Sequence, residues 1–341
     1  MSAPDVDIAI IGGGCAGLSL AARLVHSNLS VGVIEPRIAY TDDRAWSFWR
    51  TASDPFEDCV HKEWTSWTVA GQGDPVRRTS SHLRYQTIRS EDFYNRAQDL
   101  IAQDRHIDLS LGVTANGMKR CNDRWHVETD AGTLSAQIVI DTRPPARIPA
   151  YGQFFFGREI RTERPVFNPD TVQLMHFRPA RSSGVDFVYI LPFAADHALV
   201  EVTSFAPHNP GRDIYAAWLD DEIAALDPGW TETLRTEAGA LPMEVGFADP
   251  AQDGIIRMGL GGGAARPSTG YAFARNQIQA DRVAAAVIAG RVPDTRLDSR
   301  LTHFMDRVFL QVLATAPKSG PALFEALFRN VSADRLERFL S

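Results

Sequence analysis

The sequence predicts an α/β fold into which a mainly antiparallel β region is inserted. Three observations lead to this prediction. A strand, a glycine-rich turn, a helix and a second strand follow one another over residues 6–35. Residues 151–248 instead contain alternating and aromatic runs separated by turn signals, as antiparallel strands do. After residue 260 a second glycine-rich turn leads into a long helix, which indicates that the chain returns to the first domain.

The N-terminal segment has the order of a Rossmann dinucleotide-binding motif. An apolar strand at 6–11 leads into a turn at 12–17, a helix follows at 18–26, and a second apolar strand at 31–34 ends at Glu35. An acid at this distance from the turn accepts hydrogen bonds from a ribose diol and disfavours a 2′-phosphate. The sequence therefore predicts a dinucleotide ligand, and FAD or NAD rather than NADP.

Each glycine of the turn has a separate expected role. Gly12 lets the chain turn sharply out of the strand, Gly14 lets a pyrophosphate approach the backbone, and Gly17 lets the helix pack closely on the sheet. The helix N-terminus offers free N–H groups and the positive end of the helix dipole, which favour phosphate binding, and Cys15 and Ala16 in the turn before it are candidate cofactor-binding residues.

The bulk composition excludes several classes of protein. With 341 residues the chain is long enough for two domains, and 44% hydrophobic and 23% charged residues are ordinary for a globular enzyme. A net charge of −7 argues against a nucleic-acid partner. Three widely spaced cysteines form neither a disulfide framework nor a metal cluster, so we expect a reducing compartment and no metal. We expect no signal peptide and no membrane span.

Further candidate cofactor and substrate residues follow the second strand. Pro36, Arg37 and Arg44 are candidates for the cofactor site, although a solvated Arg44 beside two aspartates is equally plausible. Trp46 and Phe48 are candidates for the wall of an apolar pocket, and ordinary core aromatics are an equally good interpretation.

Residues 64–89 contain short alternating runs, such as 66–69 and 83–88, that predict antiparallel strands, and the region 60–90 is a candidate for packing with the inserted part. A helix follows from Ser90, its expected N-cap, to about residue 103. The next strands are expected at 107–111, 125–129 and 138–140.

We expect three parts. Residues 1–150 and 251–292 form the Rossmann-type domain, residues 151–250 an antiparallel substrate domain with a helix at 213–225, and residues 293–341 a helical segment. Residues 255–260 predict a strand that leads into the second glycine turn, and a long helix runs from there through 277–289. A second glycine turn late in the chain favours FAD over NAD. The expected cofactor-binding residues of this turn are Gly263, Pro267, Ser268, Thr269 and Gly270.

The C-terminal segment predicts two amphipathic helices. Phe304, Val308, Val312 and Ala316 mark the apolar face of the first, and 323–328 that of the second. We expect both faces to pack across the substrate domain rather than on a membrane, because an interfacial helix usually has a more basic polar face.

Several stretches resemble the FAD-dependent lycopene cyclases of carotenoid-producing bacteria and plants. The most specific are the aromatic strand pair 187–193 and 199–203, and the Pro-Ser-Thr-Gly-Tyr turn at 267–271. The 12–17 turn with Glu35-Pro36, the 44–48 segment and the 138–142 strand also match.

The resemblance implies a fold and an activity. It implies a flavoprotein monooxygenase-like plan and closure of the ψ-ends of lycopene into β-rings, giving β-carotene by way of γ-carotene. The reaction has no net redox change, although the family needs reduced FAD, with NAD(P)H as the expected electron donor. Lycopene would come from a bilayer, so we expect a cytoplasmic protein that associates transiently with the inner face of the cell membrane.

The resemblance also assigns site residues. Glu201 would transfer the proton, since an acid in an apolar pocket can stay protonated, and Tyr189 and Phe193 would line the pocket. Two positions depart from the family pattern. Val202 stands where a second acid is usual, and strand alternation could aim it away from the cavity. His176 stands where the family often has an acid. Two roles are open for it: it assists proton transfer, or it takes no part in the reaction.

Other activities are compatible with the same plan. An FAD-dependent monooxygenase usually carries Asp-Gly in mid-chain and Gly-Asp before the second glycine turn, where this chain has Asp141-Thr142 and Gly262-Gly263. An isoprenoid double-bond reductase would consume reduced flavin stoichiometrically. A flavin-binding redox sensor would not need the strand pair around Glu201. The sequence does not set the number of subunits.

Overall fold

The computed structural model describes residues 5–50, 54–71, 73–80, 82, 84–248 and 254–340. A seven-stranded sheet carries the N-terminal motif, with β8, β2, β1 and β11 adjacent and parallel, β17 parallel to β11, and β10 and β9 added antiparallel. The strands are β1 Asp5–Ile11, β2 Val31–Glu35, β8 Ile107–Leu111, β9 Ala115–Cys121, β10 Arg124–Thr129, β11 Gly132–Asp141 and β17 Ile255–Arg257.

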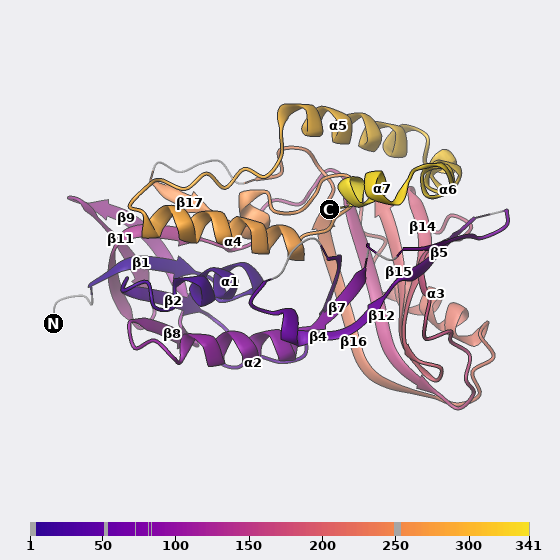
Figure 1. Cartoon of the computed structure of the whole chain (residues 1–341), viewed down its shortest axis with the longest axis horizontal. Helices are drawn as coiled ribbons and strands as arrows, with labels where there is room; N and C mark the ends of the chain where they lie inside the picture. The colour runs from indigo at the N-terminus through magenta and orange to yellow at the C-terminus, as the bar shows by residue number, and fades with distance from the viewer. Residues whose placement is uncertain are drawn as a thin grey trace.

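Three helices cover one face of this sheet (Figure 1). They are α1 Cys15–Leu24, α2 Ser90–Ile101 and α4 Phe273–Ile288. Apolar side chains of all three pack against Ile8 and Ile10 of β1 and Val31 and Val33 of β2. This is a Rossmann arrangement, and together with the second sheet described next it confirms the predicted fold class.

The second sheet is almost entirely antiparallel, in the order β16-β12-β15-β14-β13-β5-β6, with only β13 and β5 parallel. Its strands are β5 Ser66–Ala70, β6 Val76–Thr79, β12 Gly152–Thr162, β13 Val172–Phe177, β14 Val185–Ala194, β15 His197–Ala206 and β16 Thr231–Pro242. Helix α3, Arg212–Ala224, packs on one face of this sheet, and the C-terminal helices pack on the other.

A small antiparallel sheet lies where the two large sheets meet. It contains β3 Ala45–Trp49, β7 Tyr85–Arg89 and β4 Val60–Trp64. The region 60–90 therefore divides, because β5 and β6 join the second sheet while β4 and β7 join this one. The predicted domain boundary at 250–251, and position 83 of an expected strand, lie outside the described residues.

Some element boundaries differ from prediction. Ser90 is the first residue of α2 rather than its cap, and its hydroxyl donates to Thr41 and Asp42 and accepts from the Arg44 N–H. The predicted strand at 255–260 ends at Arg257, because the chain enters a 3₁₀ turn at Gly259–Gly262, where Gly259 has a φ of +72°. Strand β9 is additional to the predicted strands.

The C-terminal segment forms three helices rather than two. They are α5 Arg300–Thr315, α6 Gly320–Asn330 and α7 Ala333–Leu340, and they lie across the top of both parts in Figure 1. Helix α6 buries Phe324 and Phe328 as predicted. Helix α5 is turned the other way from the prediction, since it buries Asp306, Leu310 and Leu313 and exposes Phe304, Val308 and Val312. No helix in the described ranges is long and apolar enough to cross a bilayer.

Candidate active site

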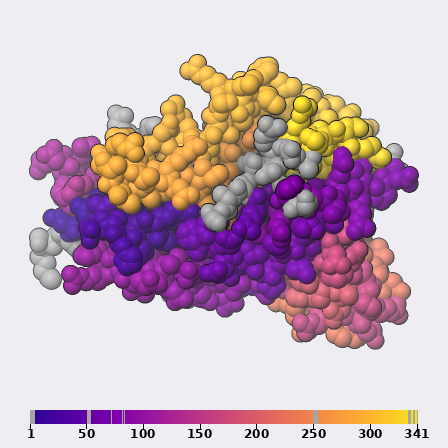
Figure 2. Space-filling model, viewed as in Figure 1, coloured from indigo at the N-terminus to yellow at the C-terminus, as the bar shows by residue number. Residues whose placement is uncertain are grey.

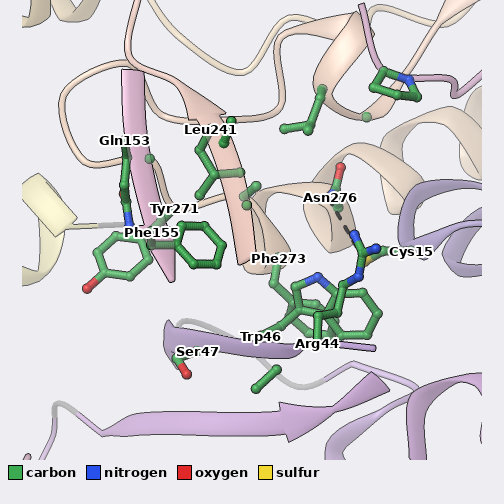
Figure 3. Close-up of a pocket in the computed structure, with 18 of the residues that line it drawn as sticks. Cys15, Arg44, Trp46, Ser47, Gln153, Phe155, Leu241, Tyr271, Phe273 and Asn276 are labelled. Carbon is green, nitrogen blue, oxygen red and sulfur yellow. Dashed lines mark hydrogen bonds between the residues drawn. The ribbon is translucent and has the colours of Figure 1, made fainter. Parts of the chain in front are cut away.

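A single cavity of about 690 Å³ runs from the glycine turn after β1 to the inner face of the second sheet (Figure 3). Its size is that of a ligand site. One end is lined by Gly12, Gly14, Cys15, Ala16 and Glu35, and the other by side chains of β12 to β16, α6 and α7. A ligand bound at the nucleotide motif would therefore face the substrate sheet directly.

The first glycine turn has the geometry that its sequence predicts. Gly12 has a φ of +100°, which favours glycine. A Cβ on Gly17 would overlap the carbonyl oxygen of Gly12, so α1 packs too closely on the turn for any other residue. At Gly14 the nearest atom to an added Cβ is Arg37 Nη2 at 3.8 Å, so this glycine leaves open space on the cavity side.

Glu35 is held by its neighbours at the cavity edge. One carboxylate oxygen accepts the Gly13 N–H at 2.7 Å, and the other accepts the N–H and Nε of Arg37 at 3.0 and 2.7 Å. The Arg37 guanidinium lies over the rings of Tyr40 and Tyr94. Pro36 and Arg37 also line the cavity. These contacts fix the acid beside the turn, where a ribose would bind.

The second glycine turn supplies polar groups. Ser268, Thr269 and Gly270 line the cavity. Gly263 and Pro267 belong to the same turn but do not line the cavity. Within the described part of the chain, Ser268 Oγ, Thr269 Oγ1 and Asn276 Oδ1 are buried without a hydrogen-bond partner. Buried polar atoms are normally satisfied. Unpaired atoms on the wall of a cavity that also contains the dinucleotide motif fit a polar cofactor.

Arg44 and Cys15 lie close together at the nucleotide end of the cavity (Figure 3). Arg44 forms an ion pair with Asp43 at 2.6 Å, and its side chain is half exposed. Burial raises the pKa of the Cys15 thiol to about 12, so the thiol is neutral. The guanidinium is therefore the charged group that a phosphate or a flavin would meet here.

Aromatic side chains form the walls of the substrate end. Tyr189 lines the cavity at this end, whereas Trp46 lines it at the nucleotide end, beside Arg44 and Phe273 (Figure 3). The hydroxyl groups of Tyr85 and Tyr189 lie 2.7 Å apart, and Tyr271 donates to Tyr85 at 3.4 Å. Burial raises the pKa of Tyr271 to about 12, which keeps this wall neutral.

Two predicted wall residues lie elsewhere. Phe48 stacks on Phe273 in the core below α4, with ring centroids 4.6 Å apart. Phe193 packs edge-on against His61 and His197 at the end of β14. The cavity walls that the prediction missed are contributed mainly by Phe155, Phe324 and Phe328.

Glu201 lies in the cavity with only 6% of its surface exposed. It accepts one hydrogen bond, from Thr203 Oγ1 at 2.9 Å. Burial, and then the charge of Glu237, raise the pKa of its carboxyl well above the usual range. Val202 points to the opposite face of the sheet, into the core beneath α3. The alternation of β15 therefore selects Glu201 for the cavity.

His176 is not brought to the cavity. Its Nε2 lies 2.9 Å from Thr68 Oγ1 on the neighbouring strand β5. Burial, and then the charge of Arg178, lower its pKa to about 4, so the ring is neutral. The neighbouring Leu174 and Met175 line the cavity instead.

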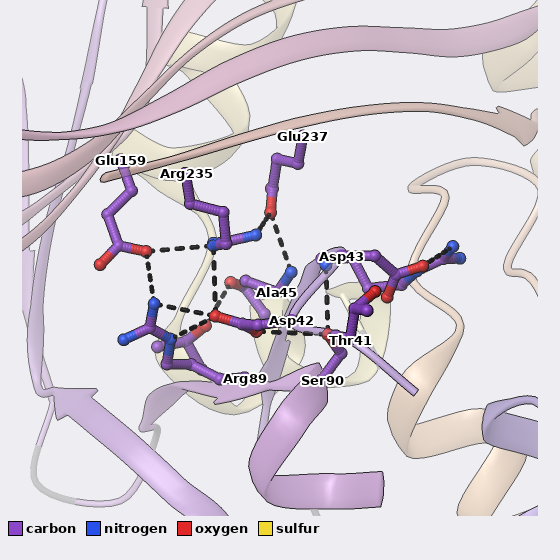
Figure 4. A network of polar contacts seen from close by, with 12 residues as sticks. Thr41, Asp42, Asp43, Ala45, Arg89, Ser90, Glu159, Arg235 and Glu237 are labelled. Carbon is purple, nitrogen blue, oxygen red and sulfur yellow. Dashed lines mark hydrogen bonds and ion pairs between the residues drawn. The ribbon is translucent and has the colours of Figure 1, made fainter. Parts of the chain in front are cut away.

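Sequence reasoning missed a second acid in the cavity, Glu237 of β16, which is 5% exposed. It accepts the Ala45 N–H at 2.9 Å and forms an ion pair with Arg235 at 2.5 Å (Figure 4). Nothing in the linear sequence marks it, because its place opposite Glu201 depends on how β15 and β16 each pair with β12.

The chain is similar along most of its length to proteins of one known family. The profile of a family described as "Lycopene cyclase protein" matches residues 7–341. The lycopene beta-cyclase of Pseudescherichia vulneris is 28% identical over 329 residues, which cover 90% of this chain and 81% of that protein. That of Paracoccus sp. (strain N81106 / MBIC 01143) is 26% identical over 372 residues, which cover 98% and 89%.

Solved structures share the fold at low identity. A geranylgeranyl bacteriochlorophyll reductase-like protein from Thermoplasma acidophilum has a TM-score of 0.66 and 14% identity, with 99% of this chain and 91% of that chain covered. The p-nitrophenol 4-monooxygenase of Pseudomonas putida DLL-E4 has a TM-score of 0.66 and 12% identity, with 98% and 96% covered. The fold is thus shared by several flavoenzyme classes, and the family is set by the match along the sequence. The chain belongs to the lycopene cyclase family.

Proposed function

We propose that this protein is a lycopene beta-cyclase that closes the ψ-ends of lycopene into β-rings, by way of γ-carotene to β-carotene, without net redox change. The observation that carries the proposal is the buried Glu201 carboxyl in an apolar cavity continuous with a dinucleotide motif. The bacterial and plant relatives named lycopene beta-cyclase support the same substrate.

The residues present fit FAD as the cofactor. The turn with Gly14 and the start of α1 would hold the diphosphate, Glu35 would hold the ribose, and the Ser268–Thr269 turn with Asn276 would hold the flavin end. Reduced FAD supplies negative charge and an electron-rich ring to the cavity. We propose NAD(P)H as the donor that reduces it.

Glu201 has the chemical state that cyclisation requires of an acid. Its proton is added to the terminal double bond, which leaves a tertiary cation, and the neighbouring double bond attacks this cation to close the ring. Loss of a ring proton to a carboxylate then restores a double bond, so one proton is added and one removed. Tyr189 is paired with Glu201 on the neighbouring strand and lines the same cavity, so its ring would face the cation, and aromatic faces attract cations. The apolar walls keep out water, which would trap it.

An anaerobic assay with lycopene in liposomes tests this function. Chemically reduced FAD, NADH and NADPH are supplied in parallel, and products and flavin oxidation state are followed together. We expect one-ring and two-ring carotenes with no net flavin oxidation. Flavin oxidation in step with product would instead indicate an isoprenoid reductase, and oxygen-dependent product a monooxygenase.

We also propose that the protein takes lycopene from the inner face of the cell membrane, with α5 as the lipid-facing element. Five exposed apolar side chains follow one stripe of α5, and Figure 2 shows this helix as a ridge along the upper edge of the molecule. They are Leu301, Phe304, Met305, Val308 and Val312, exposed by 68, 61, 58, 50 and 38%. Such a patch is unusual on a monomer that contacts only water.

Charge and position support lipid as the partner. The exposed charged residues of α5 are the basic Arg300 and Arg307, whereas its acid, Asp306, is buried in an ion pair with Arg266. This composition suits an anionic bilayer surface. The inner side of α5 presents Phe309 to Phe324 and Phe339, both of which line the cavity. The stripe therefore lies directly outside the substrate end.

Replacing Phe304 and Val308 together by serine is expected to weaken binding to anionic vesicles at least about tenfold, because each apolar side chain buried in lipid contributes on the order of 1.5 kcal/mol or more. Vesicle sedimentation measures this loss. The matched control replaces Ile214 and Trp230, which are exposed by 49 and 54% on another surface. Equal binding by the two variants would remove α5 from the proposal.

A further inference from the structure

Two buried glutamates flank one glycine of the second sheet. Gly157 of β12 pairs with Glu201 of β15 on one side and with Glu237 of β16 on the other. Directly opposed residues of antiparallel strands share a face, so both carboxyl groups enter the cavity. A Cβ at Gly157 would lie 3.3 Å from the Cβ of Glu201 and 3.4 Å from its Cγ. The glycine thus leaves both carboxyl groups room in the same part of the cavity, where burial and then the charge of Glu237 raise the pKa of Glu201.

The two acids have unequal partners. Glu237 accepts the backbone N–H of Ala45 and is paired with the guanidinium of Arg235, whereas among the described residues Glu201 accepts a hydrogen bond from the Thr203 hydroxyl alone. Donors and cations stabilise the charged form of a carboxyl group. Two carboxyl groups buried near each other in one cavity do not both ionise readily, because like charges repel. The negative charge is therefore favoured on Glu237 and the proton on Glu201.

The guanidinium of Arg235 is held in place by further acidic side chains. It donates to Glu159 at 3.1 Å and lies 3.6 Å from Asp42, and Glu159 is also paired with Arg89 and His197 (Figure 4). This network keeps the guanidinium pointing at Glu237, because Arg235 is only 8% exposed and its other contacts are acidic. The asymmetry of the glutamate pair is therefore built into the fold.

We propose that Glu201 and Glu237 hold one proton between them, with Glu237 as the anionic positioning residue that keeps Glu201 protonated. The proposal deepens the cyclase function and rests on it for its chemistry. The proton of Glu201 is added to the inner CH carbon of the terminal double bond, and the C–H proton that the new ring loses at the end returns to the pair. The pair starts and finishes each ring closure with one proton, so no external acid is consumed.

The charge-removing variant Glu237→Gln tests the pair through the pH dependence of the rate. Cyclisation requires protonated Glu201, so the rate falls as pH rises through the pKa of that carboxyl. Removing the neighbouring negative charge lowers this pKa. We expect the alkaline limb of the pH–rate profile to move down by about one unit or more, with activity recovered at lower pH. Glu237→Asp should keep most of the wild-type profile.

The matched control is Glu232→Gln, the same change at an exposed position of the same strand. It shares every pH effect that comes from the cofactor or the substrate, so its profile should coincide with that of the wild type. An unmoved alkaline limb in a folded, flavin-loaded Glu237→Gln variant would overturn the proposal. Equal loss of rate at every pH would also overturn it, because that result indicates a role other than holding the proton.

Infrared spectroscopy tests the shared proton without using activity. A protonated carboxyl group has a carbonyl stretch distinct from that of a carboxylate. Purified wild-type protein at pH 7.5 should show one such band that disappears in Glu201→Gln and titrates at lower pH in Glu237→Gln. The absence of this band in the wild type would contradict the proposal that the two glutamates hold one proton, even if the enzyme cyclises lycopene. Its presence in a protein without cyclase activity would leave the pair standing and refute the proposed function.

Discussion

Replacing Glu201 by glutamine is expected to abolish cyclisation while leaving the protein folded and able to bind its cofactor. General acids contribute about 10²–10⁴ to a rate, so we expect a loss of at least about a hundredfold. An amide cannot deliver a proton to an alkene, although it has nearly the same shape as a protonated carboxyl and can keep the hydrogen bond from Thr203. Product analysis of the anaerobic lycopene assay measures the loss, and thermal unfolding checks the fold.

The Glu201→Gln variant needs a control with the same chemical change. Glu128 is an exposed acid of β10 that forms an ion pair with Lys119, in the sheet that carries the N-terminal motif. The Glu128→Gln enzyme should cyclise lycopene at the wild-type rate. A Glu201→Gln enzyme that retains most of the wild-type rate would mean that another group delivers the proton. In the described part of the cavity that group would be Glu237, since it is the buried acid that pairs with the same residue of β12 as Glu201 does.

The parts that could be predicted from sequence depend on local order. The 12–17 turn and Glu35 are set by a strand, a turn and a helix that are adjacent in the chain, so their positions follow from spacing. The exclusion of Val202 from the cavity follows from the two-residue period of a strand. Glu201 itself was identified by resemblance rather than by pattern.

The parts that could not be predicted depend on long-range pairing. Glu237 reaches Glu201 only because both strands pair with the same residue of β12. His176 lies outside the cavity because β13 changes register between Gln173 and His176, which alternation alone does not reveal. Helix α5 has apolar residues on two sides, and periodicity cannot tell which side packs inward. The buried ion pair of Asp306 with Arg266 decides this orientation, and the two residues are 40 positions apart.

Two alanine substitutions in the first glycine turn are expected to differ in their effect on stability, although both should weaken cofactor binding. Gly14→Ala places a methyl group in the open space of the cavity, where the nearest protein atom is 3.8 Å away and the backbone φ is −80°. The apoprotein should therefore unfold at nearly the wild-type temperature. The methyl group occupies the position that a diphosphate needs, so FAD affinity should fall by about a hundredfold or more.

Gly17→Ala instead drives a methyl group into the carbonyl oxygen of Gly12 and to within 3.2 Å of Ile10 Cγ2. Helix α1 must move away from β1, which disrupts the core that it forms with α2 and α4. Overpacking of this kind costs about 1–3 kcal/mol or more, so the apoprotein should unfold at a lower temperature and also lose FAD affinity. Differential scanning calorimetry of the apoproteins and flavin titration separate the two cases. If Gly14→Ala binds FAD as the wild type does, the diphosphate does not lie at this turn. If Gly17→Ala is as stable as the wild type, the close contact between α1 and the turn does not hold the fold together.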